Sequence, residues 1–124
     1  MKIMIVDDHA DMRRILRSIA FPHTGGTEAI IECEDGAEAV EQFSLHYPDV
    51  VLMDIQLKTM NGFDAAEKIF QQEPNAKVVF VTSFATQAFR SRAEKLRAYG
   101  FISKENLSEL DLLFQNLSLK GGTP

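Results

Sequence analysis

Short apolar runs of strand length alternate with segments of helical periodicity, and this alternation constrains the fold more than any other feature. The runs are KIMIV (2–6), EAIIEC (28–33), DVVLM (49–53), KVVFV (77–81) and GFIS (100–103). Three of them are solid aliphatic runs, as expected for strands that are buried on both faces of a parallel sheet.

The gaps between these runs read as helices. Apolar residues at helical spacing predict a first helix that Pro22 ends: Met12, Ile15, Leu16 and Ile19. Four more helices are predicted over 35–48, 61–74, 86–100 and 106–120, with Gly100 just past the end of the fourth and Asn106 as N-cap of the fifth. The order is therefore strand then helix, five times, which predicts an α/β fold with a five-stranded parallel sheet and helices on both faces.

Length and composition narrow the class of protein. The 124 residues suit one domain with its own core, and we assign 1–119 to it and 120–124 to a tail or linker stub. The net charge of -5 argues against general nucleic-acid binding. The longest apolar runs are too short for a membrane helix, and the acids at positions 7 and 8 interrupt any signal-peptide pattern. The single Cys33 excludes an internal disulfide and a cysteine-based zinc cluster, so a cytoplasmic setting is the simplest expectation.

Polar residues follow four of the predicted strands. Asp7 and Asp8 follow the first, Asp54 the third, Thr82 closes the fourth and Lys104 follows the fifth. In an open α/β sheet, ligands bind outside the carboxyl ends of the strands, so these side chains are expected to meet at one edge. Crowded carboxylates repel unless a cation relieves them. Oxygen ligands favour Mg²⁺ or Mn²⁺ over zinc, and the set suits phosphoryl transfer to a carboxylate.

Each residue alone also has an ordinary explanation. Asp7 and Asp8 could form a strand-end turn or cap the first helix, Asp54 could cap a loop, Thr82 could be a plain strand residue, and Lys104 could be solvated. Their joint position after apolar strands is what favours a shared site.

Four stretches together resemble the receiver domain of two-component response regulators, of the chemotaxis type. They are IVDDH, DVVLMDIQLKTMNG, VVFVTS and YGFISKEN, and the resemblance extends over almost the whole chain. It implies the strand order 2-1-3-4-5 of that family.

The resemblance also implies a role for each residue. Asp54 would accept a phosphoryl group from a phosphohistidine of a sensor histidine kinase or phosphotransfer protein. Asp8, Asp54 and the backbone carbonyl of Gln56 would bind Mg²⁺, with Asp7 acting through a metal-bound water. Lys104 and Thr82 would contact the phosphoryl oxygens. Phe101 would be the switch aromatic, which turns inward as Thr82 moves and so changes the surface formed by 86–100, 100–103 and 106–120.

The chain departs from the common family pattern at two places. Lys58 stands where many relatives have proline, and it reads either as a solvated residue or as an extra cation near the acids. Glu105 follows Lys104 where many relatives have a cis proline. A trans bond is expected here because a non-proline cis bond costs about 3 kcal/mol. Gly62 matches a family glycine, which positive φ or a close backbone approach would explain.

Three further features keep more than one reading each. Phe84 would either shield the phosphoryl group from water or pack in the core. His9 would be a neighbour of the metal or a solvated residue at a helix start. The basic residues Arg90, Arg92, Lys95 and Arg97 would form a solvated helix face, contact an acidic partner or join a second receiver in a dimer.

The predicted function is a phosphorylation-dependent switch that catalyses only its own phosphorylation and dephosphorylation. A Mg²⁺-dependent phosphatase with an aspartyl intermediate is disfavoured because Gln56 stands where a second acid is needed. A degenerate receiver that acts only in binding is disfavoured by the complete residue set. Two features, the stretch DDH (7–9) and the non-proline residue after Lys104, also resemble receivers joined to helix-turn-helix output domains. Such a domain could therefore accompany this one.

Overall fold

Five short strands, three of which are entirely apolar apart from one closing threonine, form the centre of the molecule. The computed structural model describes residues 1–121, without the side chains of residues 27 and 119–121. The strands are β1 (Ile3–Val6), β2 (Ile30–Cys33), β3 (Val50–Met53), β4 (Val78–Thr82) and β5 (Gly100–Ser103). They form one parallel sheet in the order β2-β1-β3-β4-β5, so the predicted sheet and its strand order are confirmed.

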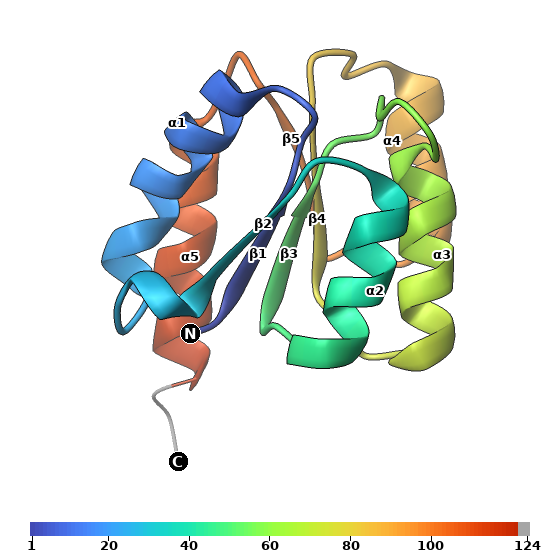
Figure 1. Ribbon diagram of the computed structural model, residues 1–124. Coiled ribbons are helices and arrows are strands. Elements are labelled where there is room, and N and C mark those ends of the chain that lie inside the picture. Colours follow the sequence, from blue (N-terminus) through green and yellow to red (C-terminus); the bar gives the residue numbers. More distant parts are fainter. Residues whose placement is uncertain (122–124) are drawn as a thin grey trace.

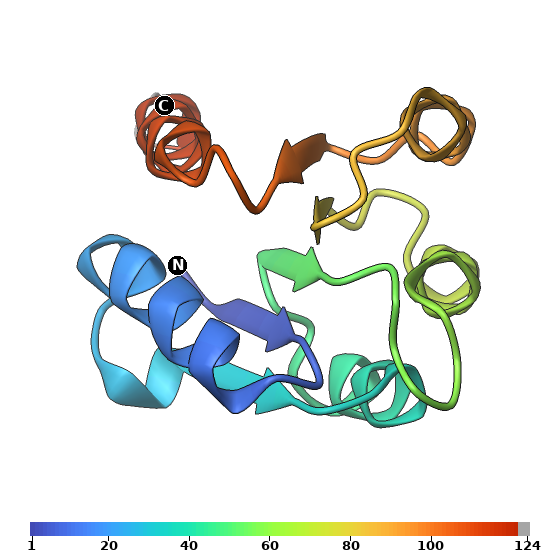
Figure 2. The ribbon, with the colours of Figure 1, turned by 90° about the horizontal axis from the view of Figure 1, so that it is seen from above.

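Helices cover both faces of this sheet, as predicted. They are α1 (Ala10–Ala20), α2 (Gly36–His46), α3 (Gly62–Gln72), α4 (Gln87–Lys95) and α5 (Ser108–Gly121). Helices α1 and α5 lie on one face, and α2, α3 and α4 lie on the other (Figures 1 and 2). Two short 3-10 helices, η1 (Phe21–His23) and η2 (Thr27–Ala29), lead from α1 into β2 and were not predicted.

The two faces carry separate apolar clusters, because side chains on a strand point alternately to opposite faces. Met4, Val6 and Phe80 face the side of α2 and α3, where they meet Phe43 and Phe63. On the other side, α1 and α5 contribute Leu16, Leu110 and Phe114, which pack on Ile3, Ile5 and Val79. With both faces covered, β1, β3 and β4 are buried at every residue.

The predicted end of the fourth helix at Gly100 is wrong. Helix α4 ends at Lys95, and the chain turns back to the sheet through Arg97, whose φ of 61° is left-handed. The Ala98 N–H donates to the Ala93 carbonyl, and the Tyr99 N–H already donates to Val78. Gly100 is instead the first residue of β5. A side chain there would lie 2.9 Å from Leu113 of α5, so glycine lets α5 pack closely on the sheet.

The fifth helix also differs slightly from its prediction. It begins at Ser108, so Asn106 is not the residue directly before it, although the Asn106 carbonyl accepts a hydrogen bond from the Glu109 N–H. It continues to Gly121, one residue beyond its predicted end at 120, and residues 122–124 of the predicted tail lie outside the described residues. Within the described part, no helix has the length and apolar character needed to cross a membrane.

Candidate phosphoacceptor and metal site

The register of β1 and β3 brings the acids that follow these two strands together. Val6 of β1 pairs with Met53 of β3, so Asp7 and Asp54 follow as neighbours at the carboxyl edge. The ladder continues into the site, because the Asp54 N–H donates to the Val6 carbonyl at 2.9 Å. Asp7 is fully buried and Asp54 is 4% exposed. The sheet itself therefore holds two carboxylates side by side away from bulk water.

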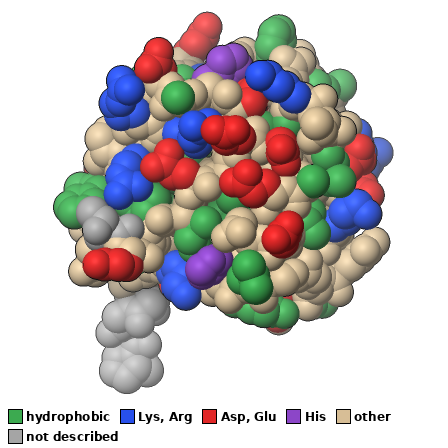
Figure 3. Space-filling model, viewed as in Figure 1, with side chains coloured by type: hydrophobic (Ala, Val, Ile, Leu, Met, Phe, Trp, Pro, Cys, Tyr) green, Lys and Arg blue, Asp and Glu red, His purple; other side chains and the backbone are tan. Residues whose placement is uncertain are grey.

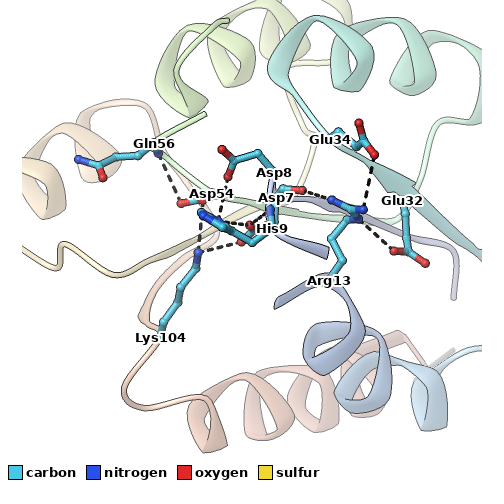
Figure 4. Close-up of polar contacts among 9 residues, drawn as sticks. All are labelled: Asp7, Asp8, His9, Arg13, Glu32, Glu34, Asp54, Gln56 and Lys104. Atoms are coloured by element: carbon cyan, nitrogen blue, oxygen red, sulfur yellow. Dashed lines mark hydrogen bonds and ion pairs between the residues drawn. The ribbon is translucent and has the colours of Figure 1, made fainter. Parts of the chain in front are cut away.

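Lys104 reaches this pair from the end of β5. Its Nζ lies 2.8 Å from Asp7 Oδ2 and 3.3 Å from Asp54 Oδ2 (Figure 4). The Lys104 N–H donates to the Thr82 carbonyl at 2.8 Å, which ties the lysine backbone to the end of β4. The Lys104–Glu105 peptide bond is trans, as expected. A trans bond therefore allows the lysine to reach both carboxylates.

Burial and charge shift the proton equilibria of this cluster. Burial raises the pKa of Asp54, and the nearby Asp7 adds to the rise, while Lys104 opposes it. Burial alone would lower the pKa of Lys104, but contact with Asp7 and Asp54 outweighs it, and that pKa is raised. The Lys104 ammonium therefore stays charged, whereas the charged form of the Asp54 carboxyl would be stabilised by any further cation placed beside it.

The loop after β1 supplies the remaining acid and a histidine. The Asp8 side chain is 10% exposed, and its Oδ1 lies 3.0 Å from His9 Nδ1. The His9 N–H donates to Asp7 Oδ1 at 2.9 Å, and the ring nitrogen lies 3.3 Å from the same oxygen. The ring is mostly exposed, yet its Nδ1 faces the acids, so His9 is both largely solvated and a neighbour of the candidate metal site.

The donor set fits a hard divalent cation. One ligand atom from each of Asp7, Asp8, His9 and Asp54 can be chosen so that all lie within 4.8 Å of one another. Asp7 Oδ2 and Asp8 Oδ1 are buried, and neither accepts a hydrogen bond of regular geometry within the described residues. Asp7 Oδ2 instead has the Lys104 ammonium at 2.8 Å, and Asp8 Oδ1 has only the His9 ring nitrogen at 3.0 Å. Carboxylate oxygens are the ligands that Mg²⁺ and Mn²⁺ use in proteins.

Arg13 is a residue of the site that sequence reasoning missed. Its Nη1 donates to the Asp7 carbonyl at 2.7 Å, while its Nε binds Glu32 Oε1 at 3.2 Å and its Nη2 lies 3.6 Å from Glu34 (Figure 4). The side chain is mostly buried and braces the loop that carries the acids. Helical spacing sets Arg13 apart from the apolar stripe of α1, but nothing in the pattern indicates a backbone partner in the loop.

On the face that Figure 3 shows, acidic and basic side chains lie side by side, with apolar side chains (green) between them. Arg17 of α1 adds a second contact to Glu32, at 3.0 Å from its Oε2. The exposed charges near β2 are thus largely paired within the chain.

The loop after β3 folds tightly over Gly62. The Gly62 N–H donates to the Ile55 carbonyl at 2.7 Å. A Cβ at this position would overlap the Asp54 carbonyl oxygen and lie 2.8 Å from Ile55 Cα. A close backbone approach, rather than positive φ, therefore explains this glycine. The Gln56 N–H lies 3.4 Å from Asp54 Oδ1, and the Lys58 side chain is exposed, which agrees with the solvated reading.

Thr82 and Phe101 lie beside the acidic cluster rather than in it. Thr82 is fully buried, and its Oγ1 accepts a hydrogen bond from the Phe84 N–H at 3.0 Å. Phe84 is 52% exposed, so its predicted alternative role in the core is wrong. Phe101 is partly buried against the apolar cluster on the side of α2, α3 and α4. The Arg90 guanidinium lies 4.6 Å from the centre of its ring.

The basic segment is only partly free for partners. The Arg92 guanidinium lies over the Phe63 ring at 4.5 Å, and it is 3.6 Å from Asp64 and from Glu67 of α3. Arg92 therefore ties α4 to α3 within the chain, which neither reading of this segment anticipated.

Comparison with known proteins agrees with this architecture. A family model described as the response regulator receiver domain matches residues 3–115. The chain is 40% identical over 103 residues to the chemotaxis protein CheY of Thermotoga maritima, covering 83% of this chain and 84% of that protein. It is 36% identical to the chemotaxis protein CheY of Bacillus subtilis over the same shares.

Solved structures show the same fold. The response regulator domain of Thermotoga maritima CheB has a TM-score of 0.80 at 27% identity, covering 94% of each chain. A CheX–CheY–BeF3–Mg²⁺ complex from Borrelia burgdorferi has a TM-score of 0.76 at 29% identity, covering 84% of this chain and 78% of that one. The chain therefore belongs to the response regulator receiver domain family, of the chemotaxis type.

Proposed function

We propose that the protein is a phosphorylation-dependent signalling switch whose phosphoacceptor is Asp54. Receiver domains are signalling switches of two-component systems rather than metabolic enzymes. The observation that carries the assignment is the buried Asp54 carboxylate, held between Lys104 and the acids of the loop after β1. Burial, an adjacent cation and a nearby set of metal ligands together suit a carboxylate that acts as a nucleophile.

The donor is a phosphohistidine of a sensor histidine kinase or a phosphotransfer protein. An Asp54 carboxylate oxygen attacks phosphorus, the P–N bond breaks, and its electron pair stays with the histidine nitrogen. The acyl phosphate that forms is later hydrolysed by water to phosphate and the free carboxylate. Lys104 changes partners from the Asp54 carboxylate to the oxygens of the phosphoryl group, where its charge offsets theirs.

Mg²⁺ is the proposed cofactor, and receiver domains generally bind it. Asp8, Asp54 and the Gln56 carbonyl would hold it, with Asp7 binding through a water, and Mn²⁺ is the alternative ion. When bound, the ion neutralises charge that develops on the phosphoryl oxygens. The buried Asp8 Oδ1, which accepts no hydrogen bond of regular geometry within the described residues, supports this assignment.

The response is read on the surface formed by α4, β5 and α5. The Thr82 hydroxyl would leave the Phe84 N–H, which it now accepts from, and donate to the phosphoryl group. Phe101 would then turn inward beside it, repacking the contact with Arg90 and so changing what a partner or output domain meets. A second receiver could bind the same surface in a dimer.

Incubation with acetyl phosphate and Mg²⁺, followed by intact-protein mass spectrometry, tests the assignment. Wild type is expected to gain one phosphoryl group, and Asp54→Asn none. Asp49→Asn, which removes a carboxylate that binds the Lys2 N–H at the opposite edge of the sheet, is the matched control and should label like wild type. If wild type stays unlabelled under conditions that modify other receivers, the alternative of a binding module independent of phosphorylation is favoured.

A further inference from the structure

The metal site carries a nitrogen atom that the proposed ligand set does not use. His9 Nδ1 lies 3.0 Å from Asp8 Oδ1 and 3.3 Å from Asp7 Oδ1, although the ring as a whole is 71% exposed (Figure 4). Because the ring could turn its nitrogens to solvent, a nitrogen directed at two buried carboxylates is a specific arrangement.

These separations match those between neighbouring ligands of one ion. Metal–ligand bonds near 2.1 Å place adjacent octahedral ligands about 3 Å apart and opposite ligands about 4.2 Å apart. The contact between Nδ1 and Oδ1 of Asp8, the proposed direct ligand, is 3.0 Å and equals the shorter spacing, while Asp7 Oδ1, proposed to act through a water, lies 3.3 Å away. The widest pair in the four-residue set, at up to 4.8 Å, exceeds the longer spacing slightly, so the loop would close a little on an ion.

The oxygens that face His9 are available to share an ion with it. Asp8 Oδ1 is buried and accepts no hydrogen bond from the described residues. Lys104 contacts the other oxygen of Asp7, Oδ2, which leaves Oδ1 on the side of the histidine. The His9 N–H donates to that Oδ1 at 2.9 Å, which fixes the start of the side chain beside the acids.

We propose that His9 is a metal ligand and makes this a mixed nitrogen–oxygen site that favours transition-metal ions such as Mn²⁺ over Mg²⁺. Imidazole binds transition metals well, whereas Mg²⁺ retains oxygen ligands and water. This inference rests on the proposed function, because it adds a ligand to the same metal site. Replacing His9 should therefore weaken Mn²⁺ binding much more than Mg²⁺ binding.

Mn²⁺ and Mg²⁺ titrations by calorimetry, together with electron spin-echo measurements on the Mn²⁺-loaded protein, test the proposal. In wild type we expect nitrogen coupling to bound Mn²⁺. In His9→Ala we expect that coupling to vanish and the ratio of Mn²⁺ to Mg²⁺ affinity to fall by about tenfold or more, the usual size of such losses. His46→Ala, which removes an exposed histidine at the end of α2, should behave like wild type in both measurements.

Three results would overturn the proposal: no nitrogen coupling in wild type, an affinity ratio that is unchanged in His9→Ala, or tighter binding of both ions by that variant. The last would mean that His9 competes with the ion as a counter-charge. Asp8→Asn separates this inference from the proposed function. If wild type binds neither ion, or if Asp8→Asn binds both as wild type does, the metal site itself is wrong. If Asp8→Asn loses both ions while His9→Ala changes neither, only the role of His9 is wrong.

Discussion

At the scale of single residues, the site is built by placing groups that repel one another where the sheet prevents them from separating. Asp7 and Asp54 are adjacent because Val6 pairs with Met53, and both are almost fully buried. Lys104 offsets part of this repulsion, but burial still raises the pKa of Asp54. Because of this crowding, a further cation beside Asp54 would stabilise its charged form.

The residue types and their order after the strands could be predicted from the sequence, since apolar runs mark where each strand ends. The contacts of Arg13 with the Asp7 carbonyl and of His9 with two carboxylates could not, because they depend on rotamers and loop geometry that have no periodicity.

Gly62 is predicted to be indispensable for the geometry of the acceptor loop. Gly62→Ala would force a methyl group against the Asp54 carbonyl oxygen, so the loop must shift or the fold must lose about 1–3 kcal/mol. We expect a lower urea midpoint and much slower labelling by acetyl phosphate. Gly25→Ala, at a position with open space around the added methyl, is the control. Normal stability together with normal labelling of Gly62→Ala would refute this explanation of the glycine.

Phe84 is predicted to protect the acyl phosphate from water. It is half exposed and lies two residues after Thr82, whose hydroxyl accepts its N–H, so its side chain is free to cover the phosphoryl group. Phe84→Ala should shorten the lifetime of the phosphorylated protein several-fold, measured by loss of label after the donor is removed. Leu45→Ala, which removes an exposed apolar side chain from α2, should leave the lifetime unaltered. An unchanged lifetime in Phe84→Ala would show that Phe84 does not protect the acyl phosphate.

At the scale of helices and strands, periodicity predicted the elements well and their ends less well. The apolar stripes located all five helices, but α4 ends at Lys95 because the chain must return to pair with β4 at Tyr99. That constraint is tertiary, and Arg97 meets it with a left-handed conformation that a glycine would adopt more readily. The glycine nearby, Gly100, has a packing role instead.

Arg92 is predicted to hold α4 against α3. It stacks on Phe63 and lies near Asp64 and Glu67, so Arg92→Ala should lower the free energy of unfolding by about 1 kcal/mol. Urea denaturation at low and high salt would measure the loss and its ionic share. Lys95→Ala removes the same charge from an exposed position of the helix and should cost much less. Equal losses of stability in the two variants would contradict the proposal that Arg92 holds α4 against α3.

At the scale of the whole molecule, each face of the sheet has its own apolar cluster, and the acids lie at the strand ends. The face under α1 and α5 and the face under α2, α3 and α4 are packed separately, while the strand ends carry the acids between them (Figure 2). The Lys104 N–H bonds to Thr82, and β5 carries Phe101, so a change at the acids has a short covalent and hydrogen-bonded route to α4.

Beryllofluoride with Mg²⁺ is therefore predicted to change hydrogen exchange mainly in α4 and β5, besides the loops of the site. We expect altered exchange over residues 87–103 and little change in α2, which lies away from Thr82 and Phe101. Phe101→Ala should retain the response at the site but lose much of that in α4. A response spread evenly over all helices, or one confined to the loops, would contradict the proposed switch.

The central claim is that Asp54 takes the phosphoryl group, and chemical trapping tests it most directly. The protein is incubated with acetyl phosphate and Mg²⁺, reduced with borohydride, which converts an aspartyl phosphate to homoserine, and then analysed by peptide mass spectrometry. The account predicts homoserine at position 54 alone. Homoserine at Asp7, Asp8 or any other acid, or none at position 54 in a protein that has gained phosphate, would contradict it.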